Sequence, residues 1–169
     1  MLLSIFALWT DRVLERGPTE IGFLFMYMGL VGAVTQFVVT GPLAKKIGEM
    51  RILQLTAVGL LLGFLGLTLT DSIVLILICL TVLSAANSLF TPVSTSIVSQ
   101  NSPAKERGAV LGIFQSIGSL GRVAGPAFSG VAFANLGYHS PFHISALVMA
   151  VCLVLLLRAS RALRAQENP

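Results

Sequence analysis

Long apolar runs separated by short polar gaps dominate the chain. Five runs cover about residues 21–41, 52–70, 73–98, 109–134 and 142–157. Each is close to the length of a membrane span, which needs about 20 residues at about 1.5 Å of rise each. The runs lack strict alternation of apolar and polar residues, and a lipid core tolerates only helices or closed barrels. The pattern therefore predicts an all-α, polytopic membrane helix bundle.

A sixth apolar run, residues 1–10, is only about half the length of a span. No basic segment precedes it, so it does not match a secretory signal peptide. We interpret it as a partial helix whose beginning lies outside the chain, and the chain as a fragment. Because all connections are short, we expect residues 1–169 to form a single transmembrane domain of antiparallel neighbours.

Composition and charge support a membrane protein and suggest its orientation. Of the 169 residues 55% are hydrophobic and 11% are charged, whereas about a quarter of a soluble domain is charged. This excludes a nucleic-acid binder and most soluble enzymes. Eight Lys and Arg residues lie in the gaps at 42–51 and 101–108 and in the tail after 157, and two lie on the other side, at 12 and 16. Basic residues mark the cytoplasmic face, so we expect a cell-membrane protein with a cytoplasmic C-terminus.

Polar side chains at membrane depth distinguish three of the five runs. In the run at 73–98 they recur at helical spacing and form one stripe. The stripe consists of Ser84, Asn87, Ser88, Thr91, Ser94 and Thr95. Such a stripe fits hydroxyls that bond their own helix or a neighbouring one, and it fits equally the lining of a cavity. Pro92 cannot donate to the carbonyl of Ser88, so we expect a bend there.

The run at 109–134 carries a basic residue at depth, Arg122. Gln115, Ser119 and Arg122 share one helix face, at i, i+4 and i+7. A guanidinium at mid-membrane costs at least about 2.5 kcal/mol on insertion scales, so it needs water, a partner or a function. Three alternatives remain: a structural cation bound to helix carbonyls, contact with an anionic or polar substrate, or pairing with a carboxylate on another helix.

Small residues form a second face of the same run, about 95° around the helix. They are Gly118, Gly121, Gly125 and Ser129. We expect this face to pack closely on another helix. The runs at 52–70 and 142–157 are apolar on every side, and we expect them at the periphery.

A further polar residue at membrane depth is a glutamine, and the sequence has no motif for catalysis or metal binding. Gln36, in the first run, fits an interhelical hydrogen bond or a ligand contact. His, Cys and carboxylate groups have no metal-ligand spacing, and neither a phosphate loop nor a nucleophile motif is present. We expect no cofactor, no metal and no enzyme activity.

The segment from residue 41 to 51 resembles the loop signature of the major facilitator superfamily, Gly-x-x-x-acidic-basic-x-Gly followed by basic residues. The matching residues are Gly41, Lys46, Gly48 and Arg51. Lys45 departs from it, because the family often has Asp or Glu there. The stretch from Thr91-Pro92 through Glu106-Arg107-Gly108 to Gly125-Pro126 is similar to the tenth and eleventh helices of drug-efflux members of the tetracycline-resistance type. Arg122 is absent from the tetracycline pattern, so that substrate is not carried over.

This resemblance implies half of a major-facilitator fold, from the end of helix 7 to helix 12. Its implied partners are the bilayer, the missing N-terminal half, a small-molecule substrate and a coupling proton or ion. The candidate cavity residues would be Gln36, Asn87, Thr91, Gln115, Ser119 and Arg122. Residues for helix packing or bending would be Gly121, Gly125, Pro92 and Pro126. The implied function is secondary transport, with efflux favoured; the alternative is a non-transporting five-span sensor, scaffold or homodimer.

Overall fold

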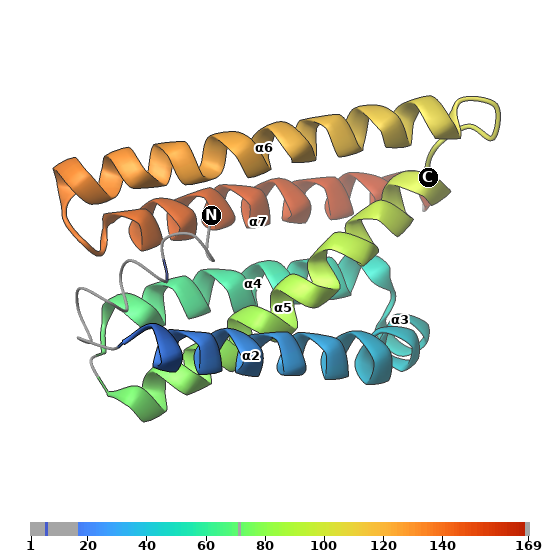
Figure 1. Cartoon of the computed structure of the whole chain (residues 1–169). Helices are drawn as coiled ribbons and strands as arrows, with labels where there is room; N and C mark the ends of the chain where they lie inside the picture. Colours follow the sequence, from blue (N-terminus) through green and yellow to red (C-terminus); the bar gives the residue numbers. More distant parts are fainter. Residues whose placement is uncertain (1–5, 7–16, 71, 168–169) are drawn as a thin grey trace.

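The computed structural model describes residues 6, 17–70 and 72–167, and its regular structure there is entirely helical (Figure 1). The elements are α2 (Pro18–Val34), the π-helical segment η1 (Thr35–Val39), α3 (Thr40–Ile47), α4 (Glu49–Thr68), α5 (Ile73–Gln100), α6 (Arg107–Leu136) and α7 (Ser140–Glu167). The all-α prediction is confirmed. The partial helix expected at residues 1–10 lies outside the described residues except Phe6, which is helical and fully buried.

Among the described residues, four helical segments are long and apolar enough to cross a membrane: Pro18–Val38, Glu49–Thr68, Ile73–Gln100 and Ser140–Arg161. They overlap four of the five expected spans. The fifth expected span coincides with α6, which is long enough at 30 residues but less apolar. Gln115, Arg122 and several glycines lower its mean hydropathy. That α6 crosses the membrane therefore stays a prediction.

The first span runs further than its apolar pattern suggests. The expected polar gap after residue 41 is helical up to Ile47, because η1 and α3 continue directly from α2. The chain turns at Gly48, whose φ is 82°. Only glycine adopts this left-handed region without a steric cost, which gives a physical reason for the second glycine of the loop signature.

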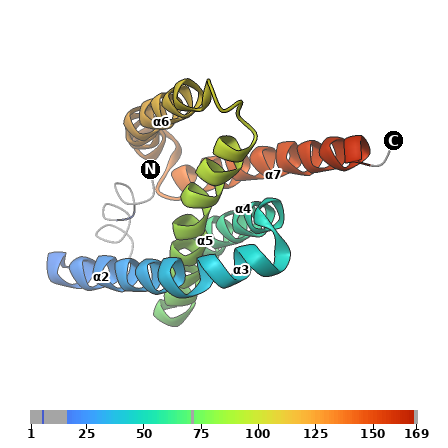
Figure 2. The ribbon, with the colours of Figure 1, turned by 90° about the vertical axis from the view of Figure 1, so that its right-hand side faces the viewer.

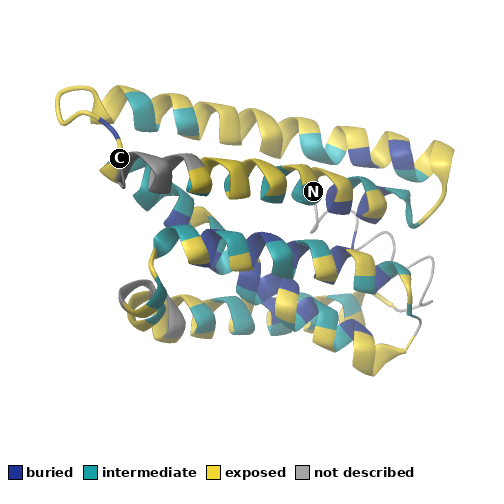
Figure 3. Cartoon of the chain, turned by 180° about the vertical axis from the view of Figure 1, so that it is seen from behind, coloured by how far each residue is buried: buried dark blue, intermediate teal, exposed yellow. Residues whose placement is uncertain are grey.

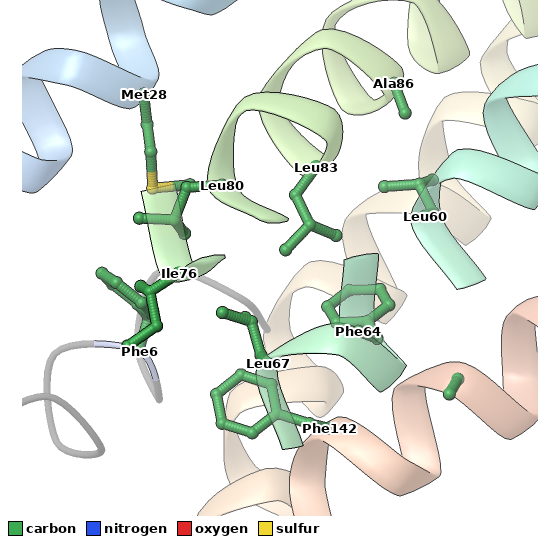
Figure 4. Close-up of a cluster of buried hydrophobic side chains, with 11 residues drawn as sticks. Phe6, Met28, Leu60, Phe64, Leu67, Ile76, Leu80, Leu83, Ala86 and Phe142 are labelled. Carbon is green, nitrogen blue, oxygen red and sulfur yellow. The ribbon is translucent and has the colours of Figure 1, made fainter. Parts of the chain in front are cut away.

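The core lies around α4 and corrects the expectation that this helix is peripheral. Helix α4 contacts both α5 and α7, and Figure 2 shows it beside α5 and below α7. One face of α4 is buried, whereas Leu55 and Leu62 on another are exposed. Leu60, Phe64 and Leu67 of α4 meet side chains from α2, α5 and α7 (Figure 4). An evenly apolar sequence can face lipid, but here half of its circumference forms the centre of the packing.

Glycines allow α4 and α5 to approach closely. Gly59, Gly63 and Gly66 are spaced four and three residues apart and share a face of α4. A Cβ on Gly63 would lie 2.5 Å from Cγ of Leu83, and one on Gly66 would lie 2.5 Å from Sγ of Cys79. Close packing through small residues, which was expected on α6, is thus found on α4. There the side chains of Leu83 and Cys79 leave no space for a Cβ on Gly63 or Gly66.

Helix α6 is the least embedded of the long helices. It lies beside α7 and is exposed along most of its length (Figures 1 and 3). Its only buried residues are Ser129 and Ala132. A Cβ on Gly121 would meet nothing within 4 Å among the described residues. The packing role of Gly121 and Gly125 therefore stays a prediction, as do the bends at Pro92 and Pro126, through which α5 and α6 continue as helices.

Candidate functional site

The six candidate cavity residues share one property: each has an exposed side chain. They come from three elements, with Gln36 on η1, Asn87 and Thr91 on α5, and Gln115, Ser119 and Arg122 on α6. No hydrogen bond within the described chain joins the α6 group to the other three. The structure thus places all six outside the α4-centred core.

Arg122 is held against its own helix. Its Nη2 donates to Oγ of Ser119 at 2.9 Å, and that hydroxyl donates to the carbonyl oxygen of Gln115 at 2.9 Å. A Cβ on Gly118 would lie 3.6 Å from Nη1 of Arg122, so the glycine leaves room for the guanidinium. The face predicted from the i, i+4, i+7 spacing is therefore a connected chain of polar groups. The guanidinium of Arg122 therefore points toward the N-terminal end of α6.

The hydrogen bond to Ser119 is the one that Arg122 makes within the described residues. None of the carbonyls of α5 accepts a hydrogen bond from Arg122 among the described residues, and the three alternatives for this cation stay predictions. Four of the five guanidinium N–H groups remain available. The cation is thus oriented but largely unsatisfied, as a group that awaits a ligand or a partner helix would be.

The polar stripe of α5 divides into three parts. Ser88, Ser94 and Thr95 donate to carbonyls of their own helix, at 2.9, 2.5 and 2.9 Å, as hydroxyls that bond locally do. Ser84 is buried, and its hydroxyl has no hydrogen-bond partner among the described residues. Asn87 and Thr91, one turn apart, are exposed. That these two residues line a cavity stays a prediction.

Gln36 lies in the π-helical segment between α2 and α3. Such segments widen a helix by one residue per turn and occur frequently at functional sites. Earlier in the same helix, a hydrogen bond joins α2 to α5. The hydroxyl of Tyr27 donates to Oγ1 of Thr81 at 2.6 Å, because the hydroxyl of Thr81 donates its own proton to the carbonyl oxygen of Leu77. The polar end of this helix is therefore held at a defined position relative to the α5 residues.

A polar cluster of Glu49, Ser96 and Gln100, which begins within the loop segment, was not predicted from the sequence. Glu49, the first residue of α4, accepts from Oγ of Ser96 at 2.7 Å and from Nε2 of Gln100 at 3.0 Å. The bonds fasten the start of α4 to the end of α5. The sequence could have predicted this contact, because a short connection makes α4 and α5 antiparallel and so brings the start of α4 close to the end of α5.

The loop-signature residues precede or follow Glu49 in the sequence. Gly41 and Lys46 lie on α3, Gly48 forms the turn, and Arg51 lies on the first turn of α4. The side chains of Lys46 and Arg51 are exposed, and neither forms an ion pair within the described part of the chain. Their basic groups remain free to contact something outside it.

Comparison with known proteins gives a consistent result. The sequence profile described as "Major Facilitator Superfamily" matches residues 1–169. Multidrug resistance protein 2 of Bacillus subtilis (strain 168) is 30% identical over 149 residues, which cover 88% of the chain and 36% of that protein. The class G tetracycline resistance protein of Vibrio anguillarum is 28% identical over 159 residues, 90% of the chain and 40% of that protein.

A solved structure shows the same fold. The human organic anion transporter MFSD10 (TETRAN) matches with a TM-score of 0.80 at 22% identity, over 91% of this chain and 38% of that one. The chain thus spans roughly two fifths of the length of the proteins that it resembles.

Proposed function

The chain belongs to the major facilitator superfamily, and we propose that it supplies one half of a secondary transporter that exports a small molecule. Transporters of this fold consist of two six-helix halves that rock about a site near the bilayer midplane. This chain would be the C-terminal half, and its partner would be a complementary N-terminal half. Export is favoured because relatives are named for multidrug and tetracycline resistance.

The observation that carries the proposal is the exposure of all six candidate cavity residues. A helix bundle in lipid should bury its polar groups and expose its apolar ones. On η1, α5 and α6 this chain leaves the six polar side chains exposed, together with apolar ones such as Phe37 and Val123, while apolar α4 lies at the centre of the core. The second half would cover these polar side chains and enclose a cavity, with Arg122 as its cation.

Orientation and coupling complete the proposal. The excess of Lys and Arg on one side would place the C-terminus in the cytoplasm of a cell-membrane protein. No Asp or Glu lies between the first and last turns of α2, α4, α5 and α6. A coupling proton or ion would therefore be bound by the other half, and Arg122 would act on the substrate or on such a carboxylate.

The test is dye efflux from cells that lack their own pumps and express the complete native polypeptide containing this sequence. Cationic, neutral and anionic fluorescent dyes are used. We expect Arg122→Ala to slow efflux by about tenfold or more, the size of a lost charge-assisted hydrogen bond. Immunoblotting and size-exclusion chromatography should show unchanged expression and a single species.

The matched control is Arg158→Ala, which removes another exposed arginine from the cytoplasmic end of α7. It should pump at the wild-type rate. Wild-type efflux by Arg122→Ala would reject a role for Arg122. A wild-type protein that moves no dye of any class would instead favour a non-transporting membrane protein.

A further inference from the structure

An apolar groove of about 270 Å³ lies outside the candidate cavity, where α3, α4 and α5 meet. Its lining includes Leu43 of α3, Leu55, Thr56 and Gly59 of α4, and Val82 and Ala85 of α5. The small residues make the hollow: the missing side chain of Gly59 and the short ones of α5 leave the space. The groove is open on one side, where Leu55 is 58% exposed.

The chemistry of the lining selects a hydrocarbon occupant. The one polar side chain among the lining residues, Thr56, donates to the carbonyl oxygen of Leu53 at 2.9 Å and is buried. It therefore offers no donor to a ligand. A polar molecule would lose its hydration here without recovering any hydrogen bond. An alkyl chain loses nothing.

Two basic side chains flank the end of the groove that the charge pattern assigns to the cytoplasm. Arg51 is one helical turn before Leu55 on α4, and Lys46 is one turn after Leu43 on α3. Both are exposed. The neighbouring carboxylate, Glu49, accepts hydrogen bonds from Ser96 and Gln100 of α5 and forms no ion pair with either cation within the described residues. The two cations outnumber this carboxylate, so the end of the apolar groove keeps a positive charge.

We propose that this groove holds an acyl chain of an anionic phospholipid whose headgroup contacts Arg51 and Lys46. An apolar slot with cations at its cytoplasmic end complements a lipid with a negative headgroup, and basic pockets between helices on that side bind such headgroups. The proposal rests on the membrane orientation given above but not on transport activity. A binding measurement can therefore fail while efflux succeeds, or the reverse.

The test is lipid binding to the complete native polypeptide, measured by native mass spectrometry with phosphatidylglycerol or phosphatidylcholine added to the detergent micelle. The wild-type protein should retain phosphatidylglycerol preferentially. Each cation near a membrane surface contributes about a fivefold preference for an anionic lipid. The double variant Lys46→Gln/Arg51→Gln should therefore lower the ratio of bound phosphatidylglycerol to bound phosphatidylcholine by about 5-fold to 25-fold. The matched control, Arg158→Gln/Arg161→Gln, removes two exposed cations from α7 and should leave the ratio unchanged.

A second variant tests the apolar part of the site. Ala85→Phe fills the groove and should reduce binding of both lipids, while leaving helical content and oligomeric state unchanged. If it does not fold, 1-palmitoyl and 1-butyryl phosphatidylglycerols replace it, and the short-chain lipid should bind more weakly. Equal retention of both headgroups by the wild type would overturn the proposal. So would an unchanged ratio in the Lys46/Arg51 variant, or binding that ignores chain length.

Discussion

The close approach of α4 and α5 at Gly63 yields a prediction with a calculable size. A Cβ at this position would lie 2.5 Å from Cγ and 2.7 Å from Cδ2 of Leu83. Leu83 is fully buried in the core cluster, and its Cγ is the branch point near the backbone, so it cannot swing aside. Overpacking of this kind costs about 1–3 kcal/mol. We expect the overpacking cost of Gly63→Ala to lie at the upper end of this range, about 3 kcal/mol. The better helix propensity of Ala offsets about 1 kcal/mol of that cost. The net destabilisation is about 2 kcal/mol.

The assay is unfolding of the complete native polypeptide in mixed micelles of increasing dodecyl sulfate content, followed by circular dichroism. A double-mutant cycle identifies the clash as the cause. Leu83→Ala alone should destabilise by about 2 kcal/mol or more, through its cavity. In that background Gly63→Ala should stabilise by about 1 kcal/mol through helix propensity, because the new methyl group occupies the vacated space. The coupling energy should reach about 3 kcal/mol, the size of the removed clash.

The control is Gly22→Ala in α2, where a Cβ would meet nothing within 4 Å. It should be neutral or stabilising by up to about 1 kcal/mol. Additive effects of the Gly63 and Leu83 substitutions, or equal effects of Gly22→Ala and Gly63→Ala, would refute the packing argument.

Three smaller predictions use the same unfolding assay. Tyr27→Phe removes the 2.6 Å bond to Thr81 between α2 and α5 and should cost about 1 kcal/mol; a neutral result would mean that the bond adds nothing. Ser129→Ala should be neutral or slightly stabilising, because the buried hydroxyl has no hydrogen-bond partner among the described residues, and a clear loss would indicate a partner elsewhere. Glu49→Ala should cost about 1.5 kcal/mol through its bonds to α5, whereas Glu106→Ala, at the exposed start of α6, should cost nothing; equal effects would argue against a fastening role.

The apolar pattern was sufficient to predict the helices, and their lengths explain why. Runs of about 20 apolar residues allow one regular structure in lipid, so α4 and α5 match their predicted runs to within three residues. Helix α7 begins close to its predicted start but continues ten residues beyond its predicted end. Helix ends were less predictable, because lipid does not decide where a polar segment stops being helical. Residues 42–47 are polar enough for a gap, yet nothing before the positive φ of Gly48 ends the helix.

Contacts between helices were predicted less well than the helices themselves. Spacing alone placed Ser119 and Arg122 on one face, and the bond between them follows from that spacing. The glycines of α4 and those of α6 have similar spacing, however. The two sets differ only in whether a neighbouring helix packs against them, which their spacing does not reveal. Leu83 fits into the α4 face, while the described chain offers nothing to Gly121. A single sequence contains the faces but not the pairing between them.

The distribution of burial supports the two-half proposal more strongly than any one residue does. Sequence polarity and burial normally oppose each other, but in this chain α6, which carries the basic residue Arg122 at membrane depth, is hardly buried. A guanidinium facing lipid would cost at least about 2.5 kcal/mol, and exposed Gln and Asn side chains would add to this. Apolar α4, which could face lipid at no cost, has the most buried residues of the helices instead. The arrangement is energetically sensible only if α6, η1 and the outer face of α5 border water or protein. A covering half with a polar cavity between the two provides both.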